Sequence, residues 1–109
     1  MDNFEAVIGR LMLAHAQLKV IDPNLLSDER RKERSKRMRD LRKAIEDTIS
    51  LKYGELSMTG KQNAQLLDAA TKGLLDTLSG LKTSVQVIKA ISAGVGAIAN
   101  LIGLIVGRP

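Results

Sequence analysis

The chain has 109 residues, with 17 lysines and arginines against 12 aspartates and glutamates, so its formal net charge is +5. That length allows one domain with one modest hydrophobic core. The lack of cysteine excludes a disulfide framework and a cysteine-based metal site, and only Phe4 and Tyr53 are aromatic. An apolar content of Leu, Ile, Val and Ala favours helix–helix packing. We therefore expect a single all-α domain over residues 1–109, with three to four helices.

The first predicted element is an amphipathic helix over residues 3–21. Its apolar residues recur at steps of three and four from Phe4 onward, which places them on one helix face. Asn3 is the expected N-cap, and Pro23 ends the helix because it disfavours the α conformation of the residue before it. The acidic N-terminus lacks the features of a cleavable signal peptide. We therefore expect synthesis in the cytoplasm, and a final location at a membrane or within an assembly.

The second predicted element is a basic helix over residues 27–56, with Ser27 as its N-cap. Its first half contains nine cationic residues, which are candidate contacts for phosphates or lipid headgroups: Arg30, Arg31, Lys32, Arg34, Lys36, Arg37, Arg39, Arg42 and Lys43. Without aromatic residues among them for base stacking, any contact with nucleic acid is expected to be non-specific. The alternative is a solvated helix paired with the acidic residues of the first helix or with Glu46, Asp47 and Glu55.

The third predicted segment spans residues 59–106 and follows a possible capping box at Thr59 and Gln62. A seam of residues spaced by three and four runs through it, which favours a long heptad-patterned helix: Leu67, Ala70, Leu74, Thr77, Leu81, Ser84, Ile88, Ile91, Val95, Ile98, Ile102 and Ile105. A glycine costs roughly 1 kcal/mol relative to alanine inside a helix. A helical hairpin, broken near Gly80 or near Gly94 and Gly96, is therefore the alternative.

The end of that segment, residues 90–107, contains no charged residue, and its length is borderline for a membrane-spanning helix. It combines a bulky ridge with a row of small residues of the kind that lets helices approach closely in membranes. The candidate helix-packing or membrane residues are Ile91, Val95, Gly96, Ile98, Ala99, Ile102, Gly103, Ile105 and Gly107. The alternative is a fully buried helix of a soluble protein, or a helix at a subunit interface.

No catalytic, cofactor-binding or metal-binding residues are predicted, and we expect no enzymatic activity and no small-molecule substrate. His15 is the only histidine and has no evident catalytic partners. The leading functional hypothesis is a structural protein that forms homo-oligomers through its C-terminal helix in or against a membrane, as a virion, filament or pore-type subunit. In it, the basic helix contacts anionic lipid or nucleic acid. The alternatives are a soluble nucleic-acid-binding or adaptor module, and a membrane-permeabilising toxin or lysis protein.

Overall fold

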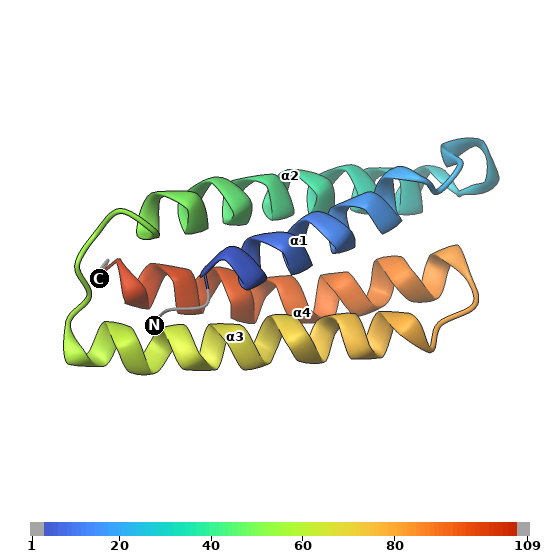
Figure 1. Cartoon of the computed structure of the whole chain (residues 1–109). Coiled ribbons are helices and arrows are strands. Elements are labelled where there is room, and N and C mark those ends of the chain that lie inside the picture. The colour runs from blue at the N-terminus through green and yellow to red at the C-terminus, as the bar shows by residue number, and fades with distance from the viewer. Residues whose placement is uncertain (1–3, 107–109) are drawn as a thin grey trace.

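The computed structural model describes residues 4–106, and this part of the chain is helical and without strands, which confirms the all-α prediction. Its helices are α1 (Phe4–Lys19), α2 (Asp28–Leu51), α3 (Met58–Ser79) and α4 (Ser84–Ile105), as Figure 1 shows. The predicted N-cap Asn3 and the packing residue Gly107 lie outside the described residues.

The four helices form an elongated bundle with extents of 45 × 25 × 19 Å. Helices α1 and α2 form one antiparallel hairpin, and α3 and α4 form a second (Figure 1). The hairpins pack with α1 on α3 and α2 on α4, so α2 and α3 occupy opposite corners. The connection from α2 to α3 therefore crosses one end of the bundle, and α2 runs parallel to α4.

Local capping residues determine most of the helix ends. Ser27 is the N-cap of α2, as predicted, and its hydroxyl accepts a hydrogen bond of 3.2 Å from the Arg30 amide. The predicted end of that helix at residue 56 is wrong, because α2 ends at Leu51 and the chain then turns toward α3. The predicted cap at Thr59 is also wrong: Ser57 caps α3, accepting from the Gly60 amide at 3.0 Å.

The hairpin alternative for residues 59–106 is the correct one. Helix α3 ends with Gly80 as its C-cap, and α4 begins after Thr83. The Thr83 hydroxyl accepts from the Gln86 amide, and the Gln86 side-chain oxygen accepts from the Thr83 amide, each at 3.2 Å. This reciprocal capping box starts a new helix, so the seam does not continue through one rod.

The core of the bundle is aliphatic and draws on all four helices. The buried positions differ from the predicted seam: in α3, Ala70 is only half-buried and Thr77 is exposed, and beyond α3 Leu81 in the turn is half-buried and Ser84 at the start of α4 is exposed. The buried face of α3 consists of Gly60, Ala64, Leu67, Thr71, Leu74 and Leu78. The spacing of the buried residues in α3 therefore does not continue into α4, because the turn at residues 80–83 separates the two helices.

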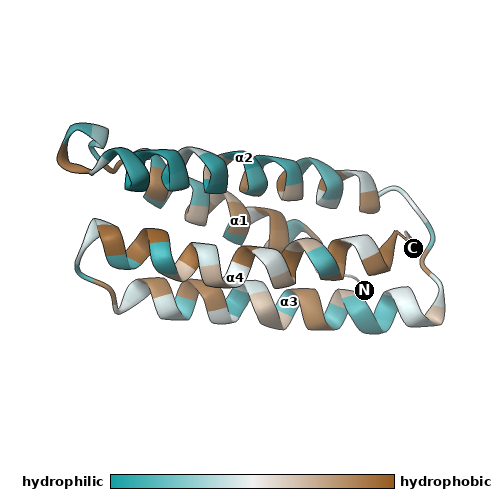
Figure 2. Cartoon of the chain, turned by 180° about the vertical axis from the view of Figure 1, so that it is seen from behind, coloured by the Kyte–Doolittle hydropathy of each residue, from teal (hydrophilic) through white to brown (hydrophobic). Residues whose placement is uncertain are grey.

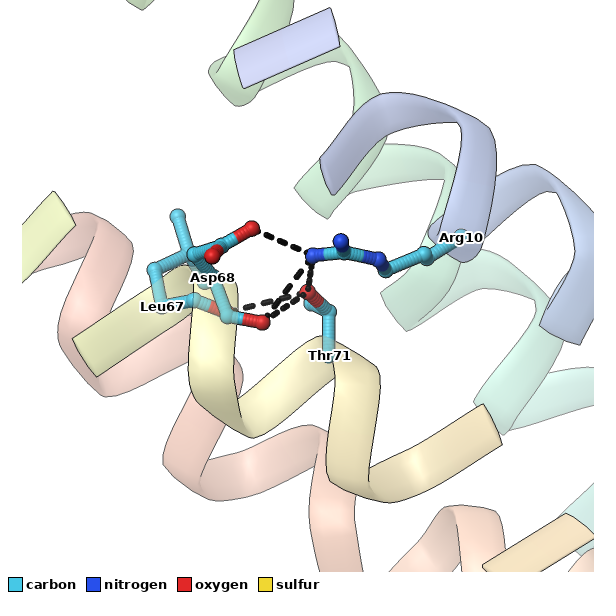
Figure 3. A network of polar contacts seen from close by, with 4 residues as sticks. All are labelled: Arg10, Leu67, Asp68 and Thr71. Carbon is cyan, nitrogen blue, oxygen red and sulfur yellow. Dashed lines mark hydrogen bonds and ion pairs between the residues drawn. The ribbon is translucent and has the colours of Figure 1, made fainter. Parts of the chain in front are cut away.

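A polar network joins α1 to α3 beside this core. Nη1 of Arg10 donates to the Asp68 carboxylate at 2.5 Å, to the Asp68 carbonyl at 3.0 Å and to the Thr71 hydroxyl at 3.3 Å (Figure 3). Thr71 itself is buried, and its hydroxyl donates to the Leu67 carbonyl at 3.0 Å. The network thus supplies hydrogen-bond partners for the polar groups of α3 that lie next to the core.

Candidate functional site

About half of the cationic cluster on α2 is neutralised within the bundle. Four of its members form ion pairs within α2: Arg30 with Glu33, Arg31 with Asp28, Arg37 with Asp40, and Lys43 with Asp47. Arg34 instead donates to the carbonyls of Leu18 and Lys19 at the end of α1, at 2.7 and 3.2 Å. There it also complements the negative end of the helix dipole.

The ion pairs of the cationic cluster are formed within α2 rather than with α1. The salt bridge of Glu33 is formed with Arg30, at 2.6 Å, and that of Arg37 with Asp40, at 2.8 Å, so both pairs use i,i+3 spacing. Of the acidic residues named as partners in α2 and the following loop, Asp47 forms an ion pair with the cluster, at 3.4 Å from Lys43. Glu5 of α1 pairs with Lys52, outside the cluster, at 3.2 Å. Local pairs therefore dominate over the pairing between helices.

The remaining cationic residues make the outer face of α2 strongly positive. Lys32, Lys36, Arg39 and Arg42 are exposed, and within residues 4–106 none of them forms an ion pair. Lys32, Lys36, Arg39 and Lys43 follow one another at steps of four, three and four, so they share one helix face. That row extends for roughly 16 Å at 1.5 Å per residue. We call it, together with Arg42, the basic face.

The basic face is almost purely polar. Figure 2 shows α2 as the most hydrophilic helix of the bundle. In α2, which the structure describes completely, Ile49 is the only large apolar side chain that is exposed, and it lies near the C-terminal end. A shallow depression of about 240 Å³ lies on the face, lined by Arg31, Lys32, Ser35 and Arg39. Such a face can neutralise phosphates but offers little surface for apolar insertion.

A small polar network joins α2 to α4 at one edge of this face. The Ser92 hydroxyl donates to the Glu33 carboxylate at 2.8 Å and accepts from Nε of Arg37 at 3.0 Å. The hydrogen bonds from Ser92 and Arg30, with the nearby charges of Arg30 and Arg37, hold the pKa of Glu33 below its ordinary value. Sequence reasoning missed this network, although a serine within an otherwise apolar helix was a signal for it.

The bulky ridge predicted on α4 lies inside the bundle. All of its members are buried in the shared core: Ile91, Val95, Ile98, Ile102 and Ile105. The small residues Gly96 and Ala99 are exposed, and Gly103 is half-buried. The sequence prediction thus separated the two faces of α4 correctly, and the bundle supplies the packing partners of the bulky one.

The small residues of α4 line a groove between α2 and α4. Its volume is about 380 Å³, and α4 contributes Val95, Gly96, Ala99, Ile102 and Gly103. The α2 wall consists of Lys36, Arg37, Asp40, Lys43, Ala44 and Asp47. We call this the α2–α4 groove. It brings Gly96, Ala99 and Gly103 together with three residues of the basic cluster, a combination that sequence reasoning did not foresee.

The glycines of this groove are not required by the packing of the bundle. A Cβ atom added at Gly96 or at Gly103 would meet nothing within 4 Å. Glycine inside a helix costs roughly 0.5–1 kcal/mol relative to alanine. Helix α4 therefore carries two destabilising glycines for which the packing of the described chain supplies no steric reason.

His15 lies between α1 and the inner side of the basic helix. Its Nε2 atom is buried and has no hydrogen-bond partner among the described residues. Burial, followed by the positive charges of Arg42, Lys19 and Arg34, lowers the pKa of His15 below its ordinary value of 6.5. The imidazole is therefore held neutral at physiological pH. Within residues 4–106, no group of three or more His, Cys, Asp or Glu residues could hold a metal ion.

Helix α4 is long and apolar enough to cross a membrane, judged by length and composition alone. A third of its most apolar stretch is buried inside the bundle, and core helices of soluble proteins meet the same criterion. The basic face and the α2–α4 groove are the two surface features that distinguish this bundle from an ordinary helical core. No protein-family model, curated protein or solved structure matches the chain.

Proposed function

We propose that this protein is a non-enzymatic helical bundle that binds the phosphate backbone of double-stranded nucleic acid through its basic face. The supporting observation is the set of exposed cationic side chains on one side of α2 that have no ion-pair partner within residues 4–106. When lysines and arginines bind the phosphates of a nucleic acid, condensed counterions are released. This release supplies most of the free energy of non-specific binding. The buried ridge of α4 then serves as the core of the bundle.

The composition of the basic face favours nucleic acid over a lipid surface. Helices that bind membranes from one side insert apolar side chains between the headgroups. Ile49 is the one exposed large apolar side chain of α2, and it lies beyond the cationic row. The helix also contains no aromatic residue on which unpaired bases could stack, which favours a duplex over a single strand.

The test is the salt dependence of binding to a short DNA duplex, followed by fluorescence anisotropy. If the four unpaired cations of the basic face, Lys32, Lys36, Arg39 and Arg42, each contact a phosphate, the plot of log K against log salt concentration should have a slope of about −3 to −4. The double variant Lys32→Gln/Arg39→Gln should bind more weakly, and its slope should be shallower by about 2.

The matched control is Lys61→Gln/Lys72→Gln, which removes the same charge from exposed positions of α3, at the corner opposite α2. It should leave the slope nearly unchanged. A salt-independent affinity, or an equal loss in both double variants, would reject the proposed interface.

A second candidate function is self-association in or against a membrane through α4, as a virion, filament or pore-type subunit. The length and apolar composition of α4 support it, together with its exposed small residues. It predicts that the protein stays in the membrane fraction through an alkaline-carbonate wash, and that Gly103→Leu reduces the oligomer size. A toxin or lysis protein would in addition release dye from vesicles. A soluble monomer without such leakage would contradict both variants of this function.

A further inference from the structure

The α2–α4 groove has the dimensions of a small-molecule site. Its volume of about 380 Å³ falls within the range of roughly 300–1,000 Å³ typical of ligand pockets. Its α4 wall extends from Val95 to Gly103, roughly 12 Å along the helix at 1.5 Å per residue. That wall is apolar throughout, since it contains only aliphatic and glycine residues.

The charges around the groove leave one positive charge uncompensated. Arg37 pairs with Asp40 at 2.8 Å, and Lys43 pairs with Asp47 at 3.4 Å, so these four charges cancel. Lys36 is the fifth charged residue of the lining, and it forms no ion pair within the described part of the chain. Since α2 and α4 run parallel, Lys36 lies toward the Val95 end of the groove and Asp47 toward the Gly103 end.

Two helix-interior positions on the α4 wall of the groove, Gly96 and Gly103, lack side chains. A Cβ atom added at either Gly96 or Gly103 would meet nothing within 4 Å, and both positions line the open groove. The glycines weaken the helix and keep the groove open. A bound molecule that approaches the backbone of α4 would account for that arrangement.

We propose that the α2–α4 groove binds a long-chain carboxylate. The singly charged carboxylate pairs with the Lys36 ammonium, and the alkyl chain lies along Gly96, Ala99 and Gly103. Apolar contact along the groove supplies most of the affinity, and Lys36 determines the orientation. The proposal is argued from the groove and not from the nucleic-acid function, although Lys36 and Lys43 belong both to the basic face and to the lining of the groove.

The probe is dodecanoate below its micellar concentration, titrated into the full-length protein and followed by calorimetry. Gly103→Leu fills the groove and should weaken binding at least tenfold. Lys36→Gln should weaken dodecanoate binding several-fold but leave the binding of dodecan-1-ol, which has the same chain without the charge, unchanged.

Two control variants test whether the effect is local. Gly73→Leu also introduces leucine where a Cβ atom meets nothing within 4 Å, but it lines the separate groove between α3 and α4. Lys32→Gln removes a charge from α2 outside the α2–α4 groove. Both should bind dodecanoate like the wild type.

Amide chemical shifts of the wild-type protein give a readout that requires no variant. Addition of dodecanoate should shift the Gly96, Ala99 and Gly103 signals more than those of Gly73 and Ala93. Absence of binding, equal shifts in both grooves, or equal affinity of the Gly103→Leu variant would overturn the proposal.

Discussion

Ser92 on α4 donates a hydrogen bond of 2.8 Å to the carboxylate of Glu33 on α2. Because Ser92 also accepts from Arg37, one hydroxyl compensates two charged groups at the interface between the hairpins. Ser92→Ala removes both hydrogen bonds and should lower the free energy of unfolding by about 1–3 kcal/mol, measured by urea denaturation. Ser50→Ala is the control: its exposed hydroxyl donates to the Glu46 carbonyl within the same helix, so its effect should stay within about 0.5 kcal/mol.

The stability of the bundle should decrease as the pH falls through the titration range of histidine. The lowered pKa of His15 means that the folded protein binds a proton less readily than the unfolded chain, whose histidine titrates near 6.5. Stability is therefore fully present above that pH and decreases below it. Melting temperatures measured from about pH 8 to about pH 5 should show the decrease, and His15→Gln should flatten it. An unchanged profile in that variant would assign the pH dependence to other groups.

At lower pH the protein should also lose the contribution that Glu33 makes to the stability of the fold. The pKa of Glu33 is held below its ordinary value of 4.5, chiefly by the hydrogen bond from Ser92. Its stabilising effect is present above that pH and disappears as the pH falls through the lower, folded-state value. Ser92→Ala should reduce this acid-induced loss, since it removes the main cause of the shift. An acid profile of Ser92→Ala that parallels the wild type would contradict this.

Replacement of glycine by alanine should have opposite effects on the free energy of unfolding at Gly103 and at Gly60. Gly103→Ala should raise the free energy of unfolding by roughly 0.5–1 kcal/mol, because the new methyl group meets no neighbour. Gly60→Ala should lower it, because the added Cβ would lie 3.2 Å from Oγ of Ser57, the oxygen that caps α3. Thermal unfolding of both variants provides the measurement, and a stabilised Gly60→Ala would show that the cap can move aside.

The capping box at the start of α4 should contribute measurably to the free energy of unfolding. Thr83→Ala removes the oxygen that accepts from the Gln86 amide, and an N-cap of this kind contributes about 1 kcal/mol. Gln86→Ala should cost less, since the amides of Lys82 and Thr83 are exposed to water. If the capping box acts as a unit, the double variant Thr83→Ala/Gln86→Ala will lose less than the sum of the single effects.

The helices themselves were predictable because their signals are local. Ser27 and the acidic residues after it define the start of α2 within a few residues of chain. The end of α2 was predicted at residue 56 instead of Leu51, although Tyr53 and Gly54 follow directly as a local signal for the end of a helix. The break after Gly80 stayed undecided, because a single glycine can be tolerated within a helix. Its decisive signal, Thr83 followed three residues later by Gln86, is present in the sequence.

The candidate site was less accessible to sequence reasoning. The pattern separated the bulky and the small face of α4, but burial of the bulky face depends on apolar residues supplied by the other three helices. Lys36 and Gly96 line one groove although they are far apart in the chain. Their proximity follows from the register between α2 and α4, and no local pattern encodes that register. The pairing of individual cations depends in the same way on side-chain geometry within α2.

The diagonal connection between α2 and α3 has a consequence for how the protein folds. Each antiparallel hairpin is contiguous in sequence, so its contacts close only short loops and can form rapidly. The two polar networks, from Arg10 to Asp68 and from Glu33 and Arg37 to Ser92, both span the interface between hairpins. Both networks therefore form only when the two hairpins associate, and their charged groups lose water in that step. Added salt should accordingly alter the rate of that association more than the rate at which either hairpin forms.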